Sequence, residues 1–296
     1  MSDNLTYPGF LASEIETPTA EEAAFHIILA PYEKSVSYGT GTDSAPSCVL
    51  NASQQLELFD GISIPARNGI YTHPPIDCSG KHDEALARIA NTVSTVMEMG
   101  KIPIMIGGEH TVTNGAMQSL MDFGEHAGII QFDAHADLRD TYQGTPYSHA
   151  CVMRRALDAG FHILQIGVRS LTEEEYILRE REDRLHYLDA SEIASQGIDK
   201  LTIPDSFPDT VYITFDVDAF DPSIIPATGT PEPGGLNWYQ AMSALLLITS
   251  RRNVIGFDAV ELAPIPGLHH PDYTVARLLY NCMGFISRSS FYGLNN

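Results

Sequence analysis

Short apolar segments alternate with segments of helical periodicity along most of this chain, and this alternation limits the fold more than any other feature. The apolar segments are nearly continuous, as expected of strands that are buried on both faces of a parallel sheet between helices. We therefore predict an α/β protein with a mainly parallel sheet. The expected strands are 25–30, 102–108, 128–133, 162–169, 211–218 and 253–262. The expected helices are 81–99, 112–120, 150–159, 172–183, 238–250 and 271–286.

The chain shows no internal repeat, no low-complexity tract and no linker that would divide it. The first 33 residues contain acidic residues but no Lys or Arg, and we interpret residues 1–24 as an N-terminal arm. Residues 31–80 are rich in Gly, Pro, Ser, Thr and Asn, which favours long loops. The interpretation is an arm over 1–24 followed by a single domain over 25–296.

The balance of charge argues against two classes of main partner. The chain has 17 basic and 38 acidic residues and a formal net charge of −21, so nucleic acids and anionic membranes would repel it. The acidity is compatible with a cationic substrate, and equally with a role in solubility alone. Four scattered cysteines form no C-x-x-C motif, and the N-terminus resembles no secretory signal. We expect a cytoplasmic protein.

Ligands of parallel α/β sheets bind at the carboxyl ends of the strands. In this chain, four of the expected strands end in carboxylate or imidazole side chains. These strand ends are Glu109-His110, the segment 133–137, the segment 216–218 and Glu261. The sequence thus predicts a polar site at one edge of the sheet.

The spacing of these side chains favours a metal centre. Residues two apart on an extended chain face the same way, so members of the segments 133–137 and 216–218 can converge. Clustered carboxylates repel one another unless a cation lies between them. The set is too large for one tetrahedral zinc ion, and oxygen and nitrogen donors without thiolate favour manganese, with iron, cobalt or nickel as alternatives. The six candidate ligands are His110, Asp133, His135, Asp137, Asp216 and Asp218.

Several longer motifs contain these residues. They are GGEH at 107–110, FDAHAD at 132–137, FDVDAFDPSIIPATGTPEPGGL at 215–236 and GFDAVELAP at 256–264, with a weaker match in PYEKSVSYGTGTDSAP at 31–46. In this order they resemble the ureohydrolase family of arginases and agmatinases. The resemblance implies a three-layer α/β/α sandwich around a mainly parallel sheet. It also implies hydrolysis of a guanidinium group to urea and an amine.

The resemblance further implies two Mn²⁺ ions per chain, bridged by a hydroxide that attacks the guanidinium carbon. One ion would be held by His110, Asp133, Asp137 and Asp216. The other would be held by His135, Asp133, Asp216 and Asp218, so that Asp133 and Asp216 bridge. The family usually has Asp where this chain has Glu109, and we expect Glu109 to orient His110.

The resemblance also implies catalytic roles outside the ligand set. Glu261 corresponds to the residue that pairs with the guanidinium group. His149, in the loop after the segment 133–137, is the candidate proton shuttle, although a surface or capping histidine is the alternative. Thr230 corresponds to a threonine of an active-site loop, although it would equally suit a turn in this Gly- and Pro-rich segment.

The residues after the 133–137 motif bear on the substrate. The segment 137–155 lacks the Asn and Ser pattern of arginases and is similar to bacterial and archaeal agmatinases, which implies hydrolysis of agmatine to putrescine and urea. Asp140, Tyr142 and Tyr147 are candidate contacts for the amine tail. Arg139 would prefer a carboxylate tail, as in guanidinobutyrate, if it points inward, and is uninformative if it points outward or pairs with Asp140.

The sequence leaves two other interpretations of the function open. The chain could be a catalytically silent metal-binding member of the family, or a related zinc deacetylase, although the paired bridging aspartates argue against the latter. Family members form trimers or hexamers, so the resemblance implies a homo-oligomer. A small guanidino compound is the expected partner, with neither nucleic acid nor membrane.

Overall fold

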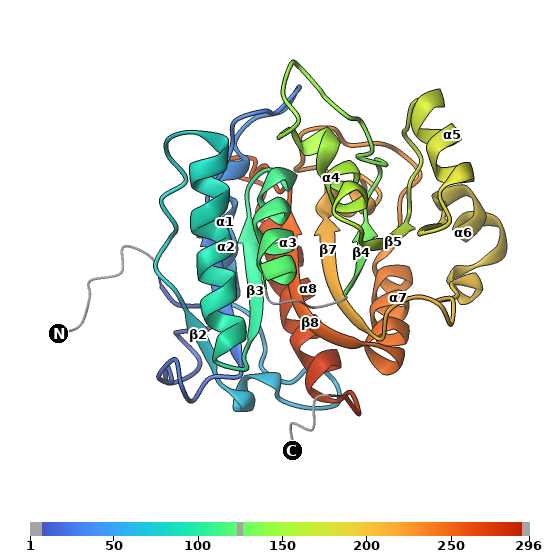
Figure 1. The fold of residues 1–296 in the computed structure, drawn as a ribbon. Helices are drawn as coiled ribbons and strands as arrows, with labels where there is room; N and C mark the ends of the chain where they lie inside the picture. The colour runs from blue at the N-terminus through green and yellow to red at the C-terminus, as the bar shows by residue number, and fades with distance from the viewer. Residues whose placement is uncertain (1–7, 123–126, 292–296) are drawn as a thin grey trace.

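The computed structural model describes residues 8–122 and 127–291 and contains one eight-stranded sheet (Figure 1). The strand order is β2-β1-β3-β8-β7-β4-β5-β6, and every neighbouring pair is parallel. This confirms the predicted parallel α/β fold. The strands are β1 (Phe25–Ala30), β2 (Ile70–Thr72), β3 (Ile102–Gly107), β4 (Gly128–Phe132), β5 (His162–Ile166), β6 (Leu185–Leu188), β7 (Thr210–Asp216) and β8 (Asn253–Val260).

Helices cover both faces of this sheet and complete the three-layer sandwich (Figure 1). Helices α1, α7 and α8 pack on one face, while α2, α3 and α4 pack on the other. The helices are α1 (Ala45–Ser53), α2 (His82–Glu98), α3 (Thr113–Asp122), α4 (Val152–Asp158), α5 (Glu173–Arg181), α6 (Ala190–Gln196), α7 (Trp238–Arg251) and α8 (His270–Ser287). Short 3₁₀ turns lie at Thr42–Ser44, Pro65–Asn68, His110–Val112, His149–Cys151, Ile198–Lys200 and Val217–Ala219.

Strand β1 shows why the strands are continuously apolar. Ile27 and Leu29 belong to the core on the α1/α8 side, while Ile28 and Ala30 belong to the core on the α2/α3 side. All four are buried, because helices cover both faces of the sheet. Burying a side chain such as Ile or Leu stabilises the fold by about 1.5–3 kcal/mol, so each face favours apolar residues.

The prediction of long loops over 31–80 was correct for most of the segment but missed two elements. Helix α1 and the edge strand β2 both lie there. The sequence APSCVLNAS of α1 is rich in residues typical of loops, but Val49 and Leu50 pack into the core beside α8. Strand β2 has only three residues, too few for a visible pattern. Strand β6 and helix α6 were also not predicted.

The described part of the predicted N-terminal arm contacts the domain. The backbone N–H of Phe10 donates to Thr72 Oγ1 at 2.9 Å, and that of Leu11 donates to Ser53 Oγ at 3.0 Å. Both side chains are buried. Residues 1–7 of the predicted arm lie outside the described residues. Among the described helices, none combines the length and the apolar character needed to cross a membrane.

The strand order places the polar strand ends together. Strands β3, β8, β7 and β4 are consecutive neighbours at the centre of the sheet. Their register aligns Ile106 with Ala259, Asp216 with Val260, and Phe132 with Phe215. The residues that follow these positions therefore meet at one edge, although the four segments lie far apart in the sequence.

Candidate metal centre

Two groups of side chains at this edge have the geometry of metal sites. His110, Asp133 and Asp216 form one, and Asp133, His135 and Asp218 form the other. In each group the candidate ligand atoms lie within 4.8 Å of one another. Asp133 belongs to both groups, so the two candidate sites adjoin. Of the remaining predicted ligands, Asp137 lies beside His110.

His110 presents one ring nitrogen to the carboxylates. Its Nδ1 atom lies 3.2 Å from Asp133 Oδ2, 3.1 Å from Asp137 Oδ2 and 3.5 Å from Asp216 Oδ2. The atom is buried, yet it has no hydrogen-bond partner within the described residues. A buried nitrogen lone pair that faces three carboxylates is the arrangement expected when a cation binds between these four groups.

The other ring nitrogen of His110 forms a hydrogen bond on the side away from the carboxylates. Its Nε2 atom lies 2.9 Å from Thr214 Oγ1, and the Thr214 hydroxyl donates to Asp258 Oδ1 at 2.6 Å. Because the only proton of that hydroxyl goes to Asp258, Thr214 accepts the Nε2–H of His110, which leaves the Nδ1 lone pair for a metal. The Tyr212 hydroxyl and Thr113 also donate to Asp258, at 2.9 and 3.0 Å.

This finding corrects the expected role of Glu109. Its carboxylate does not orient His110. It accepts instead the backbone N–H groups of Lys34 and Ser35, both at 2.7 Å, and the hydroxyls of Ser35 and Thr111. The side chain is fully buried. The longer Glu side chain thus reaches the segment after β1, and Thr214 with Asp258 takes the role next to His110.

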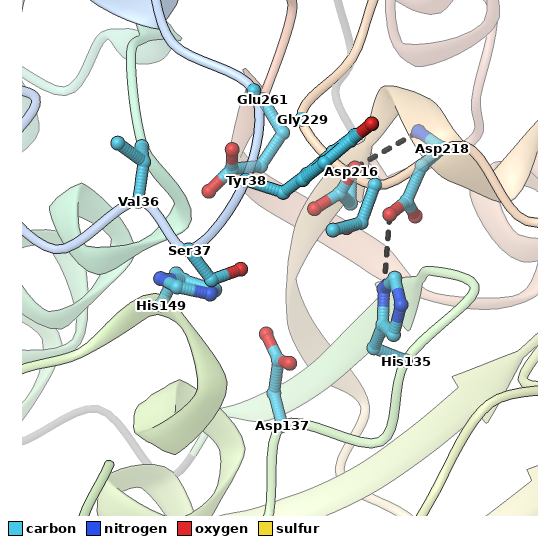
Figure 2. Close-up of a pocket in the computed structure, with 12 residues that line it drawn as sticks. Val36, Ser37, Tyr38, His135, Asp137, His149, Asp216, Asp218, Gly229 and Glu261 are labelled. Carbon is cyan, nitrogen blue, oxygen red and sulfur yellow. Dashed lines mark hydrogen bonds and ion pairs between the residues drawn. The ribbon is translucent and has the colours of Figure 1, made fainter. Parts of the chain in front are cut away.

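The second group is arranged around His135. Its Nδ1 atom lies 3.0 Å from Asp218 Oδ2 and 3.6 Å from Asp133 Oδ1. The carboxylates are held by backbone donors. Asp218 Oδ1 accepts from Ala134 N at 2.9 Å. Asp216 Oδ1 accepts from Asp218 N at 2.9 Å (Figure 2). These bonds fix the carboxylate orientations.

The crowding of carboxylates shifts their pKa values strongly. Burial, together with the charge of Asp133, raises the pKa of Asp137 to about 7. Burial and the charges of Asp218 and Asp133 raise the pKa of Asp216 well above its ordinary value. Burial opposes the charge of His135, but Asp218 and Asp133 raise its pKa to about 12. The cluster therefore attracts positive charge, and a divalent cation suits its oxygen and nitrogen donors.

Two acidic residues of the site, Asp137 and Glu261, have a strained backbone conformation. Asp137 has a φ of 53° and Glu261 a φ of 65°, a region that non-glycine residues rarely occupy. Such strain persists where the surrounding structure holds it, often at functional sites. Glu261 Oε1 accepts the backbone N–H of His110 at 2.6 Å, and burial and the nearby Glu109 raise its pKa well above the ordinary value.

Four of the six candidate ligands, His135, Asp137, Asp216 and Asp218, line one or both of two adjoining cavities. The inner cavity, of about 20 Å³, holds little more than one water molecule. The outer cavity has a volume of about 260 Å³. The residues that line both cavities are Ser37, His135, Asp137, His149 and Thr230. Figure 2 shows Glu261, Asp216 and Asp218 on one side of the inner cavity, with Asp137 and His149 across from them.

The other predicted site residues have different positions. Tyr142 and Arg139 line the outer cavity, and the Arg139 guanidinium lies 4.9 Å from the centre of the Tyr142 ring. Arg139 is exposed, and Asp140 pairs instead with Arg155 at 2.6 Å. The ring of Tyr147 stacks on His82, with 6.0 Å between ring centres, and lines neither of these two cavities.

His149 lines both cavities from the 3₁₀ turn that precedes α4. Its ring packs edge-on against Tyr142, with 5.7 Å between ring centres. Its Nδ1 atom lies 3.4 Å from the hydroxyls of both Ser35 and Ser148. Burial lowers the pKa of His149, so the ring favours its neutral form.

The sequence interpretation missed one wall of the inner cavity. Val36, Ser37, Tyr38 and Gly39 line it. The backbone N–H of Gly39 donates to the carbonyl of Gly229 at 3.2 Å, which joins this segment to the loop that contains Thr230. The available signal was the weaker motif at 31–46, whose SVSYG sequence lies here.

Comparisons with known proteins agree with this geometry. The chain matches the model of the Arginase family over residues 23–284. An N(1)-aminopropylagmatine ureohydrolase of Synechocystis sp. is 37% identical over 95% of this chain and 94% of the relative. An agmatinase of Pyrococcus horikoshii is 32% identical over 96% of this chain and 99% of the relative. The crystal structure of agmatine ureohydrolase of Thermoplasma volcanium gives a TM-score of 0.83 at 31% identity, with 94% of each chain covered.

Proposed function

Because this chain belongs to the arginase family, we propose that it is a binuclear metal hydrolase that cleaves the guanidinium group of an amine-tailed guanidine. The observation that carries the proposal is the pair of His/Asp groups that share Asp133. Three members of these groups, His135, Asp216 and Asp218, line a cavity. The wall of the same cavity contains Glu261 and His149, which are suited to hold a cation and to move a proton.

The proposed metal ligands are the six side chains His110, Asp133, His135, Asp137, Asp216 and Asp218. Asp133 and Asp216 would each contact both ions, and we propose Mn²⁺ as the metal. When bound, two such ions supply Lewis acidity that lowers the pKa of a coordinated water from 15.7 towards about 7. The reaction consumes one water and one guanidinium and yields urea and an alkylammonium, so its charge is balanced.

The remaining steps belong to side chains of the cavity. Glu261 would pair with the guanidinium N–H groups and hold the carbon towards the metal centre. His149 would take a proton from the attacking water and deliver it to the leaving amine nitrogen. A ring whose pKa lies below its ordinary value is neutral near pH 7, as a proton acceptor must be.

The proposed substrate is agmatine, which would yield putrescine and urea in polyamine biosynthesis. The outer cavity offers a carboxylate for the ammonium group of its tail. Glu175, which is 6% exposed, lines this cavity, and its capping-box bonds with Thr172 and a bond from Leu138 N hold it in place. Thr230 and Tyr142 would contact the alkyl chain.

A second candidate is N(1)-aminopropylagmatine, which would yield spermidine and urea. Its longer tail would use the outer cavity, which is far larger than the inner one. The name of the Synechocystis relative specifies this substrate. A third candidate, guanidinobutyrate, has only the position of Arg139 at the rim of the outer cavity in its favour.

The assay that tests the proposal compares urea release from agmatine, N(1)-aminopropylagmatine, arginine and 4-guanidinobutyrate in the presence of Mn²⁺. We expect one of the two amine-tailed compounds to exceed the two carboxylates by at least about 100-fold in kcat/KM. A preference for either carboxylate would contradict the substrate proposal. Urea release from none of the four would support a catalytically silent member.

Cellular location and assembly are also part of the proposal. The four dispersed cysteines, which form no C-x-x-C motif, support a cytoplasmic enzyme. The family resemblance supports a homo-oligomer, a trimer or a hexamer.

A further inference from the structure

The buried carboxylate of Glu109, which precedes the candidate ligand His110, forms hydrogen bonds with the segment after β1. Within the part of the chain that the structure describes, four hydrogen bonds reach this carboxylate, and their donors belong to Lys34, Ser35 and Thr111. Two of these donors are backbone N–H groups, which bind the same oxygen at 2.7 Å. A carboxylate bound in this way holds both the backbone and the side chain of Ser35 in one orientation.

Ser35 in turn contacts His149. The backbone N–H of His149 donates to Ser35 Oγ at 3.2 Å, and the ring Nδ1 lies 3.4 Å from the same oxygen. The hydroxyl proton of Ser35 already goes to Glu109, so its oxygen can only accept from His149. A hydrogen bond from Nδ1 to this oxygen requires the ring proton on Nδ1, and the Ser148 hydroxyl at 3.4 Å can accept from the same N–H. In that tautomer the Nε2 atom has a lone pair.

We propose that Ser35 is a positioning residue for His149. Ser35, itself oriented by Glu109, fixes the ring of His149 and selects the tautomer whose Nε2 atom can accept a proton in the cavity. This inference rests on the proposed role of His149 as the proton shuttle.

The same contact holds the wall of the inner cavity. The segment 36–39 directly follows Ser35 and lines that cavity. At its far end, the carboxylate of Glu33 accepts the N–H groups of Gly41 and Thr42 at 2.6 Å each. The segment is thus bound at both ends, and a displaced Ser35 would move the wall as well as the ring. A specific test must separate these two effects.

The kinetic test compares Ser35→Ala with the wild-type enzyme and repeats the comparison in a His149→Ala background. Without the hydroxyl, we expect kcat to fall about tenfold while KM and metal content stay within about twofold. In the His149→Ala background, Ser35→Ala should change kcat by less than twofold, because the residue that it positions is missing. Ser35→Thr keeps the hydroxyl and should restore most of kcat. Ser195→Ala, an exposed serine of α6, is the matched control.

A crystal structure of Ser35→Ala gives a readout that does not depend on activity. We expect the His149 ring to leave its position beside Tyr142, while the six candidate metal ligands keep theirs. If the wild-type enzyme hydrolyses no guanidine, the proposed function fails, and this structure still tests the positioning claim. An unmoved ring, or an equal fall in kcat in both backgrounds, would overturn the proposal.

Discussion

Hydrogen bonds to the protein decide which atom of each candidate ligand faces the metal. Thr214 takes the Nε2–H of His110 and leaves its Nδ1 lone pair free. Asp216 and Asp218 each use one oxygen to accept a backbone N–H, so the other oxygen faces the cluster. Partners of this kind orient ligands and typically alter metal affinity by 10- to 100-fold when removed.

We predict that Thr214→Val weakens Mn²⁺ binding about 10- to 100-fold without unfolding the protein. Val has the size of Thr but cannot accept the Nε2–H of His110. The measurement is metal affinity by calorimetry. Thr249→Val is the matched control, because Thr249 is also buried but its hydroxyl donates only within α7. Equal affinities for the wild-type protein and Thr214→Val would contradict the assigned orientation.

A second prediction separates metal ligation from proton transfer. Asp133→Asn and Asp216→Asn should each lose both bound metal and activity, because each removes charge from a carboxylate proposed to contact both ions. His149→Ala should keep its metal and lose about 100-fold or more in kcat. Metal content and urea release, measured on the same samples, provide the check. Full activity of His149→Ala across the pH range would exclude the shuttle role.

At the scale of elements, the segment after β1 and the loop after β7 form one wall. A Cβ on Gly39 would lie 2.8 Å from the Cα of Gly229, closer than such atoms approach in proteins. We predict that Gly39→Ala moves this wall and lowers kcat/KM at least about tenfold, with metal content unchanged. Gly9→Ala is the control, since its added Cβ would make only ordinary contacts. Unchanged kinetics in Gly39→Ala would show that the wall tolerates displacement.

The sequence was sufficient for the elements that follow a regular pattern. Continuous apolar runs located the six longest strands, and the polar residues after them located the candidate ligands that the structure brings together. The sequence was insufficient where tertiary contacts decide the structure. Helix α1 is made largely of residues typical of loops, and it packs against α8.

The parts of the site that were missed depend on the pairing of distant segments. Thr214 and Asp258 are ordinary polar residues inside apolar strands, and only the register of β7 with β8 sets them opposite each other. Ser35 reaches His149 through a bend that no local pattern marks. A sequence motif identifies ligands by their spacing, but their supporting partners come from other strands and loops.

At the scale of the whole molecule, the metal centre should control how stability depends on pH. Without metal, the folded-state pKa of Asp137 is raised to about 7 and that of His135 to about 12. In both cases the folded protein holds protons that the unfolded chain has released. Stability of the metal-free protein should therefore fall as pH rises, for Asp137 between about 4 and 7, and for His135 from about 6.5 upwards.

We predict that the free energy of unfolding of the metal-free protein falls by at least about 1 kcal/mol between pH 6.5 and 8.5. Saturating Mn²⁺ should remove or reverse this trend, because metal binding requires deprotonated ligands and strengthens as pH rises. Urea unfolding with EDTA and with Mn²⁺ at both pH values is the measurement. Greater stability of the metal-free protein at pH 8.5 would contradict the raised pKa values of Asp137 and His135.

The central claim is that six side chains from the ends of three strands, β3, β4 and β7, hold two cations. Its most direct test is a crystal structure of the protein with Mn²⁺, together with metal analysis of the same preparation. We predict two ions per chain, with Asp133 and Asp216 each contacting both. A single ion, or two ions that share neither aspartate, would contradict the account.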